Sequence, residues 1–199
     1  MNEQDYRADL AAIRSIMERS VKFASLSGWS GVLAGLYASV GAWYAYTQLN
    51  FNPQKIHETV PVAELLGLGA AVLAISLGTA VMLSMKKAAK NNSSIWNATS
   101  QRLLADMGVP LVVSGLLLLY FMKNALGGLV LPVSLLGYGL ALYNAGAYTF
   151  REIRVLGILQ LLLGLLSLLV LPWSLGLWAL GFGGLHIVFG LYLHLRYER

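Results

Sequence analysis

Residues 155–195, VLGILQLLLGLLSLLVLPWSLGLWALGFGGLHIVFGLYLHL, decide the fold because they contain no Asp, Glu, Lys or Arg. The stretch divides at Leu171-Pro172-Trp173-Ser174 into two segments, 155–173 and 174–195. A helix rises about 1.5 Å per residue and the hydrocarbon core of a bilayer is about 30 Å thick, so each segment can cross a membrane. Proline cannot continue a helix and tryptophan favours the membrane interface. These four residues are therefore the predicted turn of a transmembrane hairpin.

Four more apolar segments precede this hairpin. They predict spans at about 28–49, 61–85, 108–122 and 126–150. The third is the shortest, so it either begins near Leu103 or continues past Lys123, and Pro132 interrupts the fourth locally. With the final hairpin, the sequence predicts an all-α, polytopic transmembrane bundle of six helices in three hairpins, which occupies residues 27–199.

The composition supports this class. Hydrophobic residues make up 57% of the chain and charged residues 12%, whereas soluble domains average about 25% charged residues. Because the chain has no cysteine, disulfides and thiolate metal sites are excluded. The net charge of +5 does not indicate a nucleic-acid partner, because the basic residues are scattered and their densest cluster is only Lys86, Lys87 and Lys90.

The basic residues predict the orientation of the bundle. Of the 14 Lys and Arg residues, 12 lie in the N-terminal segment, in 86–106, in 151–154 and in the C-terminal tail. Only Lys55 and Lys123 fall on the other side. By the positive-inside rule, both termini are predicted to lie in the cytoplasm, and the absence of cysteine fits a bacterial inner membrane.

Residues 1–26 precede the first span and are predicted to form an amphipathic helix. Their apolar positions recur at steps of three and four, as on one helix face. Such a helix either lies along the lipid headgroups or docks a partner, which is a cytoplasmic protein or a second copy of the chain. In the docking interpretation, the polar segment 86–106 completes the cytoplasmic binding face.

Small residues at a spacing of four mark the first span. Ser27, Gly31 and Gly35 form a ladder of the kind that lets transmembrane helices approach closely. The ladder serves either packing within one chain or the seam of a homodimer.

Three polar residues, Asn144, Gln160 and His186, fall within predicted spans. Measured from the span midpoints, they lie about 2 to 8 Å to the cytoplasmic side of the membrane centre. They predict either a hydrogen-bonded cluster that orders the last three helices or the lining of a small cavity or proton path. His186 and His194 differ in height and helical phase, so they cannot share one metal ion, and no metal or other cofactor is expected.

Gly28-Trp29-Ser30-Gly31 resembles the Gly-x-Ser-Gly motif of rhomboid intramembrane proteases. The resemblance implies Ser30 as nucleophile with His186 as its base. A nucleophile and its base must lie within about 3 Å, yet Ser30 is expected near the cytoplasmic edge and His186 roughly 10 Å deeper. Rhomboids also carry their serine on the fourth span. No catalytic residue is therefore assigned.

A wider resemblance covers both ends of the chain. Residues 13–20 (IRSIMERS), 25–31 (SLSGWSG), 184–190 (GLHIVFG) and 196–199 (RYER) are similar to a family of small bacterial six-span inner-membrane proteins with no assigned activity. The resemblance implies the fold and the membrane, and it carries no catalytic residues.

These observations predict a non-enzymatic membrane protein of scaffold or regulatory type that binds partners. The alternative is a pathway for a small solute, a lipid or an ion through the bundle. The sequence names neither the ligand nor the partner.

Overall fold

The computed structural model describes residues 27–52, 62–90 and 94–198, and every regular element in these ranges is helical. Five long helices come first: α2 (Gly28–Thr47), α4 (Val62–Lys90), α5 (Ala98–Lys123), α6 (Val130–Ala145) and α7 (Arg151–Leu169). The sixth is one continuous run of α8 (Ser174–Trp178), the π-helix η3 (Ala179–Leu185) and α9 (His186–Tyr197). The predicted helix at 1–26 and the start of the second span at Pro61 lie outside the described residues.

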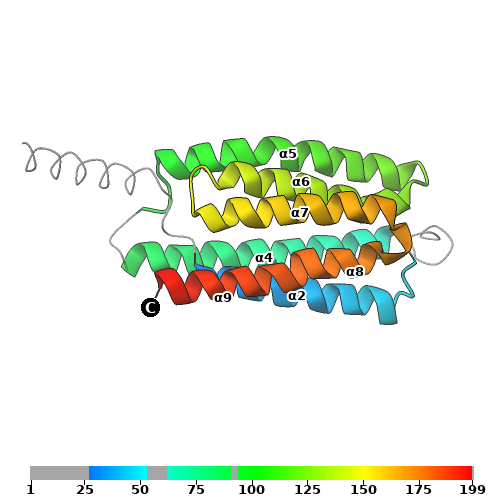
Figure 1. Cartoon of the computed structure of the whole chain (residues 1–199), viewed down its shortest axis with the longest axis horizontal. Coiled ribbons are helices and arrows are strands. Elements are labelled where there is room, and N and C mark those ends of the chain that lie inside the picture. Colours follow the sequence, from blue (N-terminus) through cyan, green and yellow to red (C-terminus); the bar gives the residue numbers. More distant parts are fainter. Residues whose placement is uncertain (1–26, 53–61, 91–93, 199) are drawn as a thin grey trace, which may run out of the picture.

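The helices lie roughly parallel and antiparallel to one another in two groups (Figure 1). One group contains α5, α6 and α7, with α6 packed against both of the others. The other contains α2, α4 and the α8–η3–α9 run, with α2 packed against both of its neighbours. The groups meet where α8 contacts α6 and α7, and where η3 and α9 contact α7. Helices α4 and α5 thus occupy the margins of the bundle.

Five helical segments are long and apolar enough to cross a membrane, by length and composition. They are Ala63–Lys90, Ala98–Lys123, Gly127–Ala145, Arg151–Leu169 and Leu171–Tyr197. A multi-pass helical membrane protein fits these findings. Helix α2 is not among the five, although it has no charged residue, because its many glycine, tyrosine and tryptophan residues make it less apolar. The sixth span therefore remains a prediction.

Helix α5 begins well before the predicted third span at 108–122. Its start is a reciprocal cap: the Ser100 backbone N–H donates to Asn97 Oδ1, and the Asn97 backbone N–H donates to Ser100 Oγ, both at 2.9 Å. This capping box satisfies two N–H groups and begins the helix at Ala98. The polar turns around Arg102 and Asp106 are therefore part of the helix. Pro110 lies inside α5 without ending it.

Other helix ends differ from the predicted spans in smaller ways. Helix α4 continues through its three lysines to Lys90. The fourth span divides into η1 (Gly127–Leu129) and α6, and Pro132 is accommodated in the first turn of α6, where the missing N–H costs little. Helix α7 begins at Arg151 and ends at Leu169. The predicted hairpin turn contains the 3₁₀-helix η2 (Leu171–Trp173), and Ser174 begins α8.

Glycines set the closest helix contacts. A Cβ atom added to Gly28 would lie 2.5 Å from the Gly190 carbonyl oxygen of α9, and one added to Gly35 would lie 2.6 Å from that of Gly183 in η3. Between α6 and α7, a Cβ on Gly157 would lie 2.6 Å from the Tyr143 backbone nitrogen. These distances are too short for any side chain, so the sequence needs glycine there for the helix backbones to touch.

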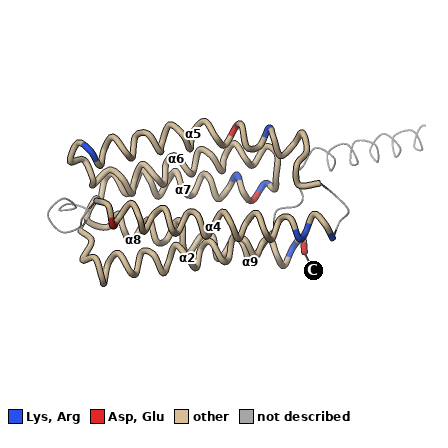
Figure 2. The backbone as a smooth tube through the Cα atoms, turned by 180° about the vertical axis from the view of Figure 1, so that it is seen from behind, with Lys and Arg blue, Asp and Glu red and all other residues tan. Residues whose placement is uncertain are grey.

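Charged residues of the described ranges gather mainly at one end of the bundle (Figure 2). This charged end consists of Lys86, Lys87, Lys90, Arg102, Asp106, Arg151, Glu152, Arg154, Arg196 and Glu198. At the opposite end, Glu64 lies in the first turn of α4 and Lys123 in the last turn of α5. This uneven distribution of charged residues between the two ends is the one expected from the predicted topology, in which most Lys and Arg residues lie on one side of the membrane.

Candidate functional site

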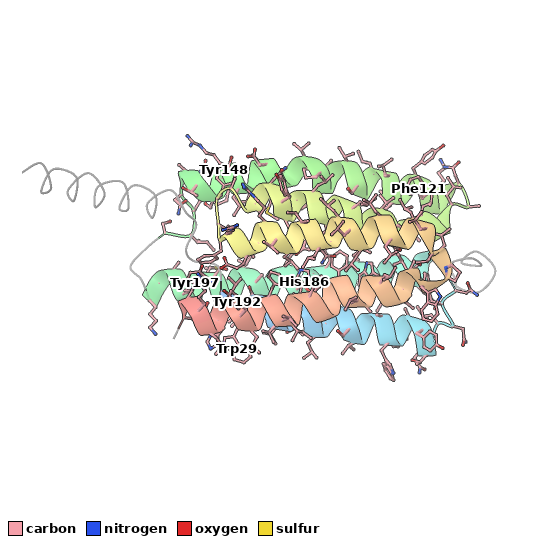
Figure 3. All side chains as sticks on the ribbon, in the orientation of Figure 1. Trp29, Phe121, Tyr148, His186, Tyr192 and Tyr197 are labelled. Atoms are coloured by element: carbon pink, nitrogen blue, oxygen red, sulfur yellow. The ribbon has the colours of Figure 1, made fainter. Side chains whose placement is uncertain are left out.

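A buried polar cluster lies where α6, α7, η3 and the start of α9 meet, and we define it as Tyr138, Gln160, Gly181 and His186. Gln160 is fully buried and donates from Nε2 to the Gly181 carbonyl at 2.9 Å. His186 is 6% exposed, and its Nδ1 lies 3.0 Å from the same carbonyl. Its Nε2 lies 2.9 Å from the Tyr138 hydroxyl. The carbonyl thus joins two side chains from different helices, and Figure 3 places His186 midway along the bundle.

These contacts fix the protonation pattern of the cluster. A carbonyl only accepts, so Nδ1 of His186 carries the proton that it donates to Gly181. In the neutral ring, Nε2 then accepts the hydroxyl proton of Tyr138. Gly181 lies in the π-helical segment, a type of irregularity that is frequent at functional sites. A methyl group on Gly181 would lie 2.5 Å from Gln160 Oε1 and 2.7 Å from Leu135 Cδ2, so these two buried side chains would have to shift.

Asn144 does not belong to this cluster, although it was predicted together with Gln160 and His186. Its Nδ2 donates instead to the Asp106 backbone carbonyl on α5 at 3.0 Å, at an exposed position. The three residues were predicted to meet because they lie at similar depth along the membrane normal. Depth does not determine the rotation of α6 about its axis, and this rotation turns Asn144 toward α5. Of the three predicted residues, the structure therefore brings together only Gln160 and His186.

Four buried polar side-chain atoms have no hydrogen-bond partner among the described residues: Glu152 Oε2 at the charged end, and Gln160 Oε1, Ser167 Oγ and Ser174 Oγ along the α7–α8 hairpin. The last three side chains are fully buried. Gln160 and Ser167 lie two turns apart on α7, whereas Ser174 begins α8 across the hairpin turn. Unsatisfied groups of this kind are rare in native interiors and call for an ordered water or a ligand atom.

The small-residue ladder packs within the chain. Gly31 and Gly35 face Gly190 and Gly183 of the last helical run, and Ser27 is buried at the start of α2. This arrangement supports the first of the two interpretations, packing within one chain.

Ser30 and His186 form no hydrogen bond with each other in the structure. The Ser30 hydroxyl donates to the Ser27 carbonyl at 2.5 Å. Both ring nitrogens of His186 are engaged by Gly181 and Tyr138. The contacts of a serine–histidine protease are therefore not formed here.

A second group of polar contacts, at the charged end, centres on Glu198. Its carboxylate accepts hydrogen bonds from the Gly28 backbone N–H at 2.9 Å, from Lys87 Nζ at 2.9 Å and from His194 Nδ1 at 2.7 Å. Burial alone would raise the pKa of this carboxyl, but the three hydrogen bonds and the charge of Lys87 outweigh burial and lower the pKa from 4.5 to about 2. One carboxylate thereby connects α2, α4 and α9.

Neighbouring contacts at the charged end connect α7 with α9 and α5 with the turn after α6. Glu152 Oε1 accepts from Tyr197 at 3.1 Å and lies 3.4 Å from Arg196 Nη1. The Tyr148 hydroxyl donates to Asp106, and this hydrogen bond is the main cause that raises the pKa of Tyr148. The labelled Tyr148, Tyr192 and Tyr197 all lie toward this end (Figure 3).

Two of the hollows on the described part of the surface lie toward opposite ends of the bundle. The larger, with a volume of about 1130 Å³, lies between the end of α2 and the η2–α8 turn, and its walls include Trp43, Tyr46 and Trp173. The smaller, of about 410 Å³, lies between α7 and α9 and is lined by Arg151, Glu152, Val155, Val188, Phe189 and Tyr192. Among the described residues, no group of three His, Cys, Asp or Glu side chains could hold a metal ion.

Comparison of the chain with protein-family models, with curated proteins and with solved structures finds no match. The function must therefore be inferred from the residues and contacts of this chain. Sequence reasoning missed Tyr138 and Glu198. The hydroxyl of Tyr138 in the middle of a span was a signal that could have been used, whereas nothing in the sequence connected Glu198 to Gly28.

Proposed function

We propose that this chain is a non-enzymatic, six-span protein of a bacterial inner membrane, with both termini in the cytoplasm, that works by binding other proteins. The observation that carries the proposal is the unpacked outer surface of α4. This helix packs mainly against α2, and none of the residues in its apolar membrane-crossing window is buried. It is available for contact along most of its circumference.

The outward face of α4 has the composition of a helix interface. Exposed small residues follow it at spacings of three and four: Ala63, Gly67, Ala71, Ala74 and Gly78. A Cβ on Gly67 or Gly78 would meet no atom within 4 Å, in contrast to the tightly packed glycines of α2 and α7. Because small residues let membrane helices approach closely, this ladder favours a transmembrane helix of another protein, or of a second copy, as the partner of α4.

The charged end supplies the second part of the proposed binding surface. Lys86, Lys90 and Arg102 are exposed there, at the ends of the two marginal helices. Together with residues 1–26, segment 86–106 would present a basic surface to the cytoplasm. Such a surface favours a partner with an acidic face, because complementary charge speeds and orients association.

Site-specific photocrosslinking in native membranes tests the proposal. A photoreactive side chain replaces Ala74 on the ladder, and in a control it replaces Leu162, which is 57% exposed on α7. We expect a discrete protein adduct from position 74 only. Deletion of residues 1–22 should abolish co-purification of a cytoplasmic partner and leave the thermal unfolding of the bundle unchanged. Lipid adducts alone at both positions, together with unchanged co-purification, would refute the proposal.

A pathway through the bundle is the second candidate, and the unpartnered buried atoms of Gln160, Ser167 and Ser174 favour it. Such atoms could hold a file of water molecules along the α7–α8 hairpin. Liposomes that contain the protein should then show a solute or proton flux that falls in Ser167→Ala and changes in His186→Ala. Absence of flux for a broad panel of solutes and ions would end this interpretation.

A further inference from the structure

The smaller hollow is a groove with two chemically distinct parts. It lies between the first turns of α7 and the middle of α9, and each helix contributes three lining residues. Arg151 and Glu152 form its mouth at the charged end, while Val155, Val188 and Phe189 line its apolar part. An occupant must therefore combine a polar head with an apolar body.

The mouth of the groove carries an unpaired positive charge. Glu152 Oε1 is engaged by Arg196 and Tyr197, so Arg196 balances the charge of this carboxylate, while Glu152 Oε2 is buried without a hydrogen-bond partner among the described residues. Arg151 is exposed, and among the described residues its guanidinium has neither an ion-pair partner nor a hydrogen-bond partner. Helix α7 also begins here without a side-chain cap: the Ile153 N–H donates to the Phe150 carbonyl, and the N–H groups of Arg151 and Glu152 and the positive end of the helix dipole lie at this end. The mouth favours an anion.

The depth of the groove fits the boundary between headgroups and acyl chains. Helix α7 has 19 residues and so measures about 28 Å, close to the thickness of the hydrocarbon core. Arg151, at its first position, falls at headgroup level. Val155 lies one turn, about 6 Å, deeper. Val155 and Val188 are 42% and 61% exposed, which leaves an apolar wall open to the bilayer.

We propose that this groove binds one anionic phospholipid of the surrounding bilayer. Its phosphate lies against Arg151 and the first N–H groups of α7, and an acyl chain follows Val155, Val188 and Phe189. Basic pockets between transmembrane helices on the cytoplasmic side bind anionic headgroups by this chemistry. The lipid fills the gap between α7 and α9 and so joins the two helical groups.

Native mass spectrometry of the detergent-released protein, titrated with equal concentrations of phosphatidylglycerol and phosphatidylcholine, tests the proposal. We expect one phosphatidylglycerol to be retained per chain in preference to phosphatidylcholine. Arg151→Gln should weaken this retention by about five-fold, the effect of removing one basic side chain near a charged membrane surface. Arg102→Gln, which removes an exposed charge from the same end but outside the groove, should leave retention unchanged, and Arg151→Lys should keep most of it.

Two further measurements distinguish binding of a lipid in the groove from general electrostatic attraction of anionic lipids to the protein. Val188→Trp narrows the apolar part and should weaken retention of both lipids while the thermal unfolding midpoint is preserved. Inorganic phosphate should not compete at concentrations that match the lipid, because it has no chain. Equal losses in Arg151→Gln and Arg102→Gln, equal retention of the two lipids, or full competition by phosphate would overturn the proposal.

Discussion

A single carboxylate, that of Glu198, connects three helices at the charged end. It accepts from the first N–H group of α2, from Lys87 of α4 and from His194 of α9. Each of these hydrogen bonds involves a charged acceptor, and such bonds are stronger than those between neutral groups. Glu198 also satisfies an N–H at the start of α2, where the side chain of the N-cap residue Ser27 makes no capping bond.

Acid should weaken this junction. The pKa of Glu198 is about 2 in the folded protein, against an ordinary value of 4.5. Because the folded value is lower, the carboxylate contributes its full stabilisation above about pH 4.5 and loses it as the pH falls toward 2. We expect the difference in thermal unfolding midpoint between the parent chain and Glu198→Gln to shrink over this interval. A difference that stays constant from pH 7 to pH 3 would contradict the assigned role.

Individual polar residues show which contacts can be predicted from the sequence and which cannot. The rise per residue predicted a similar depth for Gln160 and His186, and in the structure both side chains contact the Gly181 carbonyl. It could not predict that they meet through the Gly181 carbonyl, because a backbone group carries no sequence signal. The contact of Asn144 with Asp106 required the phase of α6 relative to α5, and a hydropathy profile contains no such information.

Helices of this bundle carry two kinds of glycine. Those on α2, α6, α7 and α9 lie against neighbouring backbone or side chains, where an added Cβ would clash. Those on α4 and α5 meet no atom within 4 Å. The first kind sets the distance between helices within the chain, whereas the second leaves surface that the bilayer or a partner helix can cover.

Alanine substitutions should distinguish the two kinds. Gly35→Ala places a Cβ 2.6 Å from the Gly183 carbonyl oxygen and 2.9 Å from the Ile187 nitrogen, so we expect a loss of about 1–3 kcal/mol in unfolding free energy. The matched change Gly67→Ala enters open space on α4 and should have no cost, since alanine is the better helix former. Thermal or denaturant unfolding in detergent measures both. Equal effects would show that α2 is not packed as described.

The helices themselves were largely predictable, and their ends were not. Long apolar segments predicted all the helices from α2 to α9, because a bilayer-spanning length of apolar residues leaves little alternative to a helix. The start of α5 at Ala98 depends on the cap formed by Asn97 and Ser100, which a search for apolar residues ignores. The π-helix at 179–185 is equally invisible to hydropathy, because its residues are as apolar as those of a regular helix.

At the scale of the whole molecule, charge is distributed asymmetrically along the bundle axis. Most charged side chains of the described residues lie at one end (Figure 2). The positive-inside rule would place this end in the cytoplasm. Five spans are supported by length and composition, and the crossing of α2 decides whether the total is six.

Cysteine labelling tests this topology directly, because the chain has no native cysteine. Single cysteines replace Gln48 at the end of α2, Asn124 at the end of α5 and Ser94 before α5, all of them exposed positions. With six spans, a membrane-impermeant thiol reagent should label Cys at 48 and 124 in intact spheroplasts and Cys at 94 only after permeabilisation. A fourth cysteine at Ser20, before α2, decides the crossing of that helix. With six spans it should be labelled only after permeabilisation, whereas it will be labelled together with position 48 in intact spheroplasts if α2 does not cross.

The contact between Gly28 and Glu198 also has a consequence for biosynthesis. These residues are 170 positions apart, and α2 finds its glycine-lined neighbour only in the last helix of the chain. At ordinary translation rates, roughly 10–30 s pass between their syntheses. During that interval the face of α2 that will contact α9 has no neighbour from the same chain. A nascent chain that is cut short before α9 would have α2 packed against α4 alone, with its glycine-lined face uncovered, and membrane proteases could recognise that face as unfinished.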